Sequence, residues 1–158
     1  IPRGGAGGFT AYLPEQDRYY MTKSKMEDQL VTLLGGRAAE ALVLKDISTG
    51  AQNDIERATK LARQMVTHYG MSEKLGPMTY GTDDEEIFVG RDFGRTRNYS
   101  EEVAAAIDRE MRNLIDKAYN KAEQLLRENI DKLHKVAEAL LEKETLDAKE
   151  FEEIFASA

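Results

Sequence analysis

The sequence predicts a mainly α-helical fold with a short strand near its amino terminus and a small candidate β-hairpin further along. Apolar residues recur every three or four positions in several segments, which is the period of an amphipathic helix. Helix-start patterns precede most of these segments, and apolar and polar residues alternate only over short stretches. At 158 residues the chain fits one domain with a sizeable core.

Composition excludes several classes of function. The net charge is −7 with no basic stripe, so we expect no nucleic-acid partner. There is no cysteine, which excludes a disulfide framework, a thiolate nucleophile and a thiolate zinc site. No Gly-x-x-x-x-Gly-Lys-Ser/Thr motif is present, so no nucleotide is expected to bind by the P-loop route.

The amino-terminal segment is rich in glycine and then alternates. Residues Phe9 to Leu13 have a period of two and predict a half-buried strand that ends at Pro14. Such a segment is either a turn followed by a strand or an edge strand that pairs with an extended peptide. The chain opens on Ile1 rather than methionine and contains no apolar run near the roughly 18 residues of a membrane span. Because the chain does not open on methionine, we expect an internal piece of a longer protein.

The first helix is predicted over residues 24–44. Ser24 and Glu27 have the spacing of a capping box. Its apolar face comprises Met26, Leu30, Leu33, Leu34, Ala38 and Leu42. Gly35 and Gly36 inside the helix each cost about 1 kcal/mol relative to alanine, so we expect another backbone to approach closely there.

A second helix is predicted from Gln52 to a stop at Gly70, after the turn Ser48-Thr49-Gly50. Asp54 falls in its first turn. By local physics this aspartate needs no function, because carboxylates are favoured at helix amino termini.

The remaining segments predict a hairpin and three helices. Met78 to Tyr80 and Ile87 to Val89 flank a polar stretch and are the strands of the candidate hairpin. A long helix starts at Ser100, and its apolar stripe is expected to pack on a helix over residues 130–143. A last short helix is capped by Asp147 and Glu150. The helical half serves either as scaffold or as a subunit contact.

The chain offers little of the chemistry of a hydrolase. Its two histidines, His68 and His134, lie 66 positions apart, and neither has a partner at helical spacing. We interpret both as ordinary helix residues. A Gly-x-Ser-x-Gly elbow is absent, and the paired carboxylates are expected on the solvated surface. No catalytic residue is predicted in this chain.

Three segments together resemble one known family: Gly35-Gly36-Arg37-Ala38-Ala39-Glu40, Ser48 to Thr59, and Met71 to Pro77. They are similar to the peptidase domain of the FtsH-type membrane-anchored AAA+ zinc metalloproteases, and the resemblance covers nearly the whole chain. In that family the aspartate matching Asp54 is the third zinc ligand. The first two ligands are histidines of a His-Glu-x-x-His helix, which this chain lacks.

The resemblance also bears on two individual residues. Glu40 is a candidate for a supporting role near the metal, with a surface or capping carboxylate as the alternative. Ala41 departs from many relatives, which have a second glutamate there.

The resemblance also implies a function. The complete protein is expected to be an ATP-dependent zinc endopeptidase that degrades membrane proteins and unstable cytoplasmic proteins. Its peptidase domains are expected to form a homo-hexamer beneath an AAA+ ring that binds ATP and Mg²⁺. Amino-terminal segments absent from this chain would anchor it in the plasma (inner) membrane, with the peptidase domain on the cytoplasmic side.

Within such a protein, residues 1–158 would be the carboxyl-terminal part of one metallopeptidase domain. Residues 1–99 would be the metal-proximal part and residues 100–158 a helical carboxyl-terminal subdomain. Alone, this piece is expected to be soluble and inactive and to hold no cofactor tightly. The alternative is a non-enzymatic helical oligomerisation or interaction module that derives from the same scaffold.

Overall fold

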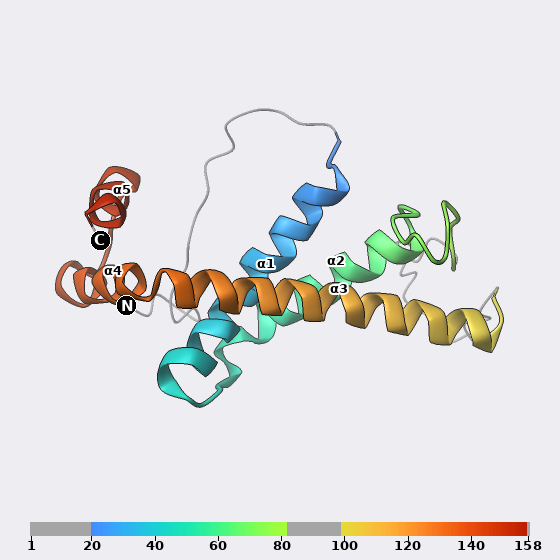
Figure 1. Cartoon of the computed structure of the whole chain (residues 1–158), viewed down its shortest axis with the longest axis horizontal. Coiled ribbons are helices and arrows are strands. Elements are labelled where there is room, and N and C mark those ends of the chain that lie inside the picture. The colour runs from blue at the N-terminus through green and yellow to red at the C-terminus, as the bar shows by residue number, and fades with distance from the viewer. Residues whose placement is uncertain (1–19, 82–98, 158) are drawn as a thin grey trace, which may run out of the picture.

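The computed structural model describes residues 20–81 and 99–157 and is helical in both ranges (Figure 1). The elements in order are α1 (Lys23–Ala39), the π-helix η1 (Glu40–Leu44), the 3-10 helix η2 (Thr49–Ala51), α2 (Gln52–Thr67), α3 (Glu101–Glu128), α4 (Ile130–Lys143) and α5 (Ala148–Ala156). Because these two ranges contain no strand, they confirm the prediction of a mainly α fold.

The β-structure predicted from the sequence is not found in the described part of the chain. The strand expected from Phe9 to Leu13 and the second hairpin strand, Ile87 to Val89, lie outside the described residues. Met78 to Tyr80 is described and is irregular rather than a strand. Its backbone is anchored differently, because the amide of Tyr80 donates to the carbonyl of Thr67 at 2.8 Å and its hydroxyl donates to the carbonyl of Leu75 at 2.8 Å.

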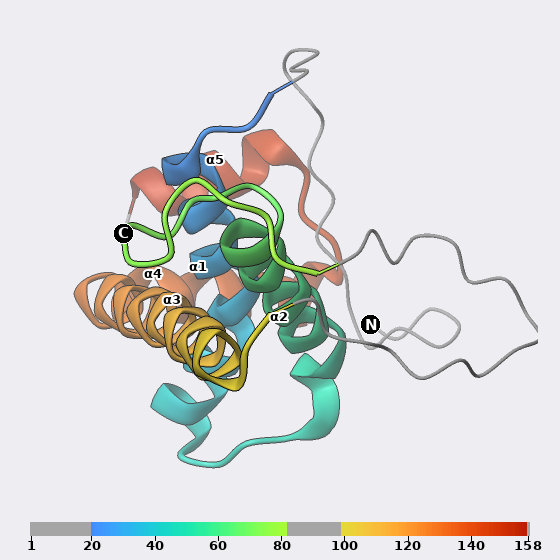
Figure 2. The ribbon, with the colours of Figure 1, turned by 90° about the vertical axis from the view of Figure 1, so that its right-hand side faces the viewer.

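The core lies where α3 crosses α1 and α2 (Figures 1 and 2). All three helices contact one another and contribute apolar side chains to one cluster. Its buried members are Met26, Leu30, Leu33, Leu34, Ala58, Ala62, Met65 and Ala118. These positions follow the helical periods expected from the sequence, so the predicted apolar faces of α1 and α2 are the buried ones.

The predicted partner of α3 is wrong. Residues 130–143 form α4, as expected, but α3 packs chiefly on α1 and α2 and touches α4 only slightly. An antiparallel helix pair needs a connection of about 2–5 residues, and here only Asn129 separates the two helices. The amide of Asn129 still donates to the carbonyls of Leu125 and Leu126, so the chain cannot fold back on α3.

A second cluster joins the end of α2 to the first half of α3. Its buried members are Val66, Ile107 and Met111. Gly70 ends the helical run, as predicted, with φ of +59°, and a Cβ there would lie only 2.9 Å from Cα of Pro77. The loop that follows is tied to α3, because the buried hydroxyl of Ser72 donates to Glu110 at 2.8 Å.

Two local expectations for α1 are not met. The amino-terminal cap is Thr22 rather than Ser24, with the hydroxyl of Thr22 accepting from the amide of Lys25 at 3.4 Å. A Cβ added to Gly35 or to Gly36 would meet no described atom within 4 Å. The close backbone approach expected at this pair is therefore not seen among the described residues.

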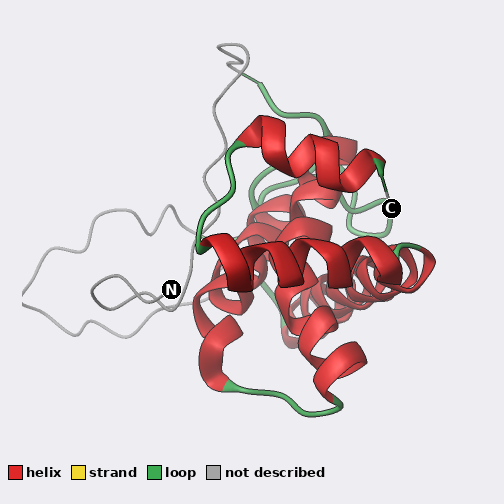
Figure 3. Cartoon of the chain, turned by 90° about the vertical axis from the view of Figure 1, so that its left-hand side faces the viewer, coloured by secondary structure: helices red, strands yellow, loops and turns green. Residues whose placement is uncertain are grey.

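Helices α4 and α5 lie beyond the end of α3 (Figure 1) and pack on each other (Figure 3). The capping box at Asp147 and Glu150 is present as predicted, and Lys143 forms an ion pair with Glu150 at 2.7 Å. Neither helix contains a buried residue, and Leu141 is 85% exposed. The inward face predicted for residues 130–143 is thus wrong, since its apolar side chains remain partly or fully exposed.

None of the described helices combines the length and the apolar character that a bilayer crossing requires.

Replacing Leu30 by alanine should lower the free energy of unfolding by about 2–5 kcal/mol, because it removes a fully buried side chain from the α1–α2–α3 core. Leu141→Ala is the matched control, since that side chain is exposed and its loss should change stability by no more than about 0.5 kcal/mol. Urea denaturation followed by circular dichroism measures both. Equal losses in the two variants would contradict the assigned core.

Candidate functional site

Asp54 lies in the first turn of α2, where the sequence predicts it. Its side chain is 47% exposed, and the contact that defines its surroundings is Arg57, whose guanidinium lies 3.5 Å away. At the amino terminus of a helix the backbone amides and the macrodipole favour a carboxylate. Asp54 therefore presents an ionisable oxygen at an accessible helix end.

The start of α2 depends on the turn before it. Ala51 precedes α2 and provides no side-chain cap. The cap is supplied three residues earlier, where the Ser48 hydroxyl accepts from the amide of Gly50 at 3.0 Å and begins η2. Because η2 runs directly into α2, Ser48 sets the position from which the Asp54 turn begins.

Ser48 is in turn held by the end of α1. Its hydroxyl donates to the Glu40 carboxylate at 2.5 Å and its amide donates to the other carboxylate oxygen at 3.4 Å. Nη1 of Arg37 donates to the Ser48 carbonyl at 3.0 Å and lies 3.6 Å from Glu40. We call these three residues, Arg37, Glu40 and Ser48, the Ser48 clamp.

The clamp alters the acidity of its carboxyl group. The hydrogen bond from the Ser48 hydroxyl lowers the pKa of Glu40. Partial burial acts in the opposite direction, but the Ser48 amide and Arg37 lower the pKa further, so it lies below the ordinary glutamate value. Glu40 is accordingly charged at neutral pH, as the two donors require.

Neither histidine joins Asp54 in a metal site within the described ranges. His68 is the C-cap residue that follows α2, and its exposed ring makes an edge contact with Tyr69, with the ring centroids 5.1 Å apart. At about 1.5 Å per residue, α2 separates it from Asp54 by roughly 20 Å. His134 is exposed on α4, and residues 20–81 and 99–157 contain no group of three potential ligands close enough for one ion.

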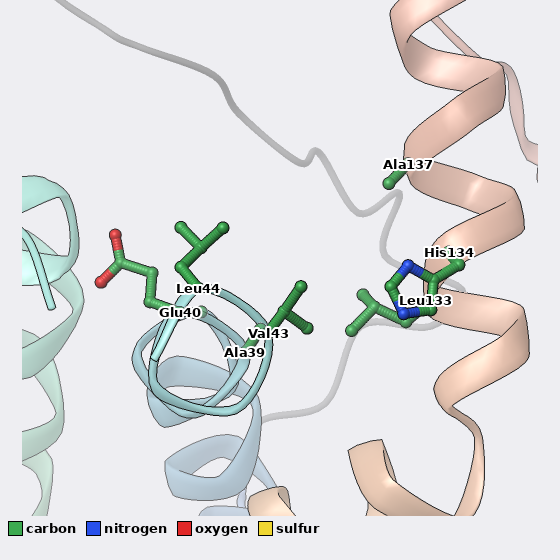
Figure 4. A pocket seen from close by; sticks show the side chains of 8 residues that line it. Ala39, Glu40, Val43, Leu44, Leu133, His134 and Ala137 are labelled. Atoms are coloured by element: carbon green, nitrogen blue, oxygen red, sulfur yellow. The ribbon is translucent and has the colours of Figure 1, made fainter. Parts of the chain in front are cut away.

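An open, mostly apolar hollow of about 240 Å³ lies between η1 and α4. Figure 4 shows Val43 directed toward Leu133 and His134, whereas the Glu40 carboxylate points to the opposite side of η1. Glu40 therefore belongs functionally to the Ser48 clamp rather than to this hollow. Sequence reasoning missed the hollow because it depends on where α4 lies in space.

The sequence matches peptidase family M41 over residues 1–154. The chain belongs to peptidase family M41. The match covers the first described range and the second as far as residue 154, and it includes Asp54 and the Ser48 clamp.

Relatives of high sequence identity are described as ATP-dependent zinc metalloproteases. An "ATP-dependent zinc metalloprotease FtsH 1" of Thermoanaerobacter sp. (strain X514) is 70% identical over 155 residues, which are 98% of this chain and 25% of that protein. An "ATP-dependent zinc metalloprotease FtsH" of Caldicellulosiruptor bescii is 65% identical over 154 residues, again 98% of this chain and 25% of that protein. The chain thus spans about a quarter of the length of these curated relatives.

The described residues of this M41 chain fit zinc only in part. A catalytic zinc site of a peptidase has three protein ligands and one position for water, and imidazole nitrogen and carboxylate oxygen are suitable ligands. Asp54 offers one such oxygen, half exposed to solvent. Further ligands would have to come from outside residues 20–81 and 99–157, because these ranges hold no three-ligand group.

Glu40→Gln should reduce stability near neutral pH and make it less sensitive to acid. Because the folded pKa lies below the unfolded one, Glu40 contributes fully above the ordinary glutamate value of about 4.3, and this contribution is lost as the pH falls through the folded pKa. Urea midpoints measured across an acid-to-neutral pH series would record the difference. Glu138→Gln, at an exposed position on α4, is the control. Parallel pH profiles for Glu40→Gln and the parent chain would contradict this role of the carboxylate.

The 158-residue chain by itself should retain no stoichiometric zinc after dialysis and should not digest casein. One carboxylate cannot hold the ion tightly without imidazole ligands. Elemental analysis beside a casein assay measures both properties. One tightly held zinc per chain, lost on Asp54→Ala, would show that the ligand set is already complete.

Proposed function

We propose that this chain is the carboxyl-terminal part of the peptidase domain of an ATP-dependent zinc metalloendopeptidase, and that Asp54 is one of the zinc ligands. The observation that carries the proposal is the M41 match over residues 1–154, together with relatives described as ATP-dependent zinc metalloproteases at 65–70% identity. Residues 1–99 would form the metal-proximal part and residues 100–158 the helical carboxyl-terminal part.

The exposure and the position of Asp54 support its role. A half-exposed carboxylate can accept a metal ion without the large desolvation cost of a buried charge. Its place in the first turn of α2, whose axis is fixed by packing in the core, limits the range of positions that the oxygen can occupy. Such restriction is what a metal ligand requires, since supporting groups must orient it.

This chain's own contribution to the chemistry would be one ligand and a rigid support. The zinc, when bound, would act as a Lewis acid toward the scissile carbonyl and lower the pKa of a bound water. Asp54 would supply a carboxylate oxygen, and Arg57 lies 3.5 Å from it. The general base would come from a His-Glu-x-x-His segment, a motif that these 158 residues do not contain.

The surroundings of the complete protein are part of the same proposal. Its substrates would be unfolded or membrane proteins, and its subunits would form a homo-hexamer. ATP and Mg²⁺ would bind in an AAA+ domain, and segments outside this chain would anchor the protein in the plasma (inner) membrane with the peptidase on the cytoplasmic side.

A second candidate is a non-enzymatic helical interaction module. It is favoured by the α4–α5 pair, which buries none of its residues and leaves Leu140, Leu141, Phe151 and Phe155 exposed by 41–85%. The sequence encoded immediately before Ile1 separates the two candidates. An intact His-Glu-x-x-His motif there would support the peptidase, and its absence would support the interaction module.

In a protein that carries this chain behind a His-Glu-x-x-His helix, Asp54→Asn should abolish proteolysis and bound zinc while the helical content is unchanged. The amide keeps the shape of the side chain but loses the anionic oxygen. Asp116→Asn, at an exposed position on α3, is the matched control and should retain both properties. Zinc content, casein digestion and circular dichroism are the measurements. Full activity of Asp54→Asn would reduce Asp54 to a helix-start carboxylate.

A further inference from the structure

We propose that the Ser48 clamp positions Asp54, so that Ser48, Glu40 and Arg37 are positioning residues for the metal ligand. The role at the metal rests on the function proposed above. The mechanical part, that the clamp fixes the turn from which α2 begins, stands on the geometry of this chain alone.

The clamp uses every polar group that Ser48 possesses. Its amide and hydroxyl both donate to Glu40, and its carbonyl accepts from Arg37. The hydroxyl oxygen also accepts from Gly50. Hydrogen bonds to charged groups are stronger than those between neutral groups. An exposed residue is thus held in place by contacts that reach back 8 and 11 positions along the chain.

Apolar packing does not fix this segment. After η1 the backbone turns at Lys45, where φ is +53°, and Ile47 is 58% exposed. The next buried side chain is Ala51, which is 8% exposed and lies beyond Ser48. Between the end of η1 and Ala51, the polar contacts of the Ser48 clamp therefore tie the loop to α1.

The turn lies directly against the clamp. A Cβ added to Gly50 would come within 3.2 Å of the Ser48 hydroxyl oxygen and 3.7 Å of a Glu40 carboxylate oxygen. The amide of Gln52 then donates to the carbonyl of Thr49, so η2 continues into α2 without a break. Asp54 is the third residue of α2. A shift of Ser48 would consequently be passed to the Asp54 backbone over six residues, or about two helical turns.

The carboxylate of the clamp begins an unusual element. Glu40 is the first residue of η1, a π-helix, and such wide turns are frequent at functional sites. Its side chain and that of Arg37 are each only 23% exposed, so solvent screens this pair less than a surface ion pair. Both side chains form hydrogen bonds with Ser48. Figure 4 shows that the Glu40 carboxylate points away from Leu133 and His134 on α4.

Amide hydrogen exchange on the 158-residue chain tests whether the Ser48 clamp fixes the turn from which α2 begins. Ser48→Ala and Glu40→Gln should each speed exchange at Gly50 and Gln52 by about five- to tenfold, as loss of a helix cap would. Ser48→Thr keeps a hydroxyl and should restore most of the protection. Ser24→Ala, at an exposed serine of α1 that is not the cap, is the control and should leave these amides unchanged. Unchanged exchange in both clamp variants would overturn the proposal.

Zinc affinity of the complete metalloprotease tests the positioning role. Titration of zinc against a chromophoric chelator should give about 10- to 100-fold weaker binding for Ser48→Ala and Glu40→Gln, the usual effect of losing a group that orients a ligand. Ser48→Thr should recover the affinity, and Ser24→Ala should not change it. Faster exchange with unaltered zinc affinity would overturn the positioning role and leave a local helix cap.

Asp54→Asn in the same titration separates this inference from the proposed function. If that variant binds zinc as the parent does, Asp54 is not a ligand, and both the proposed role of Asp54 and the positioning of a ligand are overturned. The exchange measurement still decides whether the clamp holds the turn. If Asp54→Asn loses zinc and the clamp variants do not, only the positioning role fails.

Discussion

The packing of α3 across α1 and α2 is the interaction on which the described structure depends. Small side chains line this contact: Ala58, Ala62 and Ala118 are each at most 5% exposed. Alanines at a crossing allow helix axes to approach toward the lower end of the usual 8–10 Å range. The large apolar side chains of α1 then fill the remaining space. With both neighbours fixed in this way, α2 has one orientation.

The Ser48 clamp adds a different type of restraint to that core. Burial of apolar surface is non-directional and fixes which face of a helix points inward. Hydrogen bonds to charged groups are directional and fix where a backbone lies. The core therefore determines the axis of α2, whereas Arg37, Glu40 and Ser48 determine the point at which the chain enters it. A site built at a helix start needs both restraints.

The sequence alone predicts the secondary-structure elements better than it predicts the tertiary contacts between them. The bounds of α4 and the capping box of α5 are recovered because periodicity and capping act over three or four residues. The partner of α3 was wrong, because an apolar stripe identifies a face but not what covers it. The Ser48 clamp escaped notice since its contacts join a helix end to a loop 8–11 residues away. Asp54 was singled out only through the family resemblance, because local physics gives any helix-start aspartate the same appearance.

Because a single residue, Asn129, joins α3 to α4, a small rotation there would displace the whole α4–α5 pair. Helix α4 has 14 residues and buries none of them, so the core does not fix its direction. At about 1.5 Å per residue the helix is roughly 21 Å long. A rotation of about 10° at the junction would therefore displace its far end, and α5 with it, by nearly 4 Å. The ion pair of Lys143 with Glu150 and the bond from Lys135 to the carbonyl of Ser157 link α4 and α5 to each other. Any such rotation would move the two helices together as one rigid body.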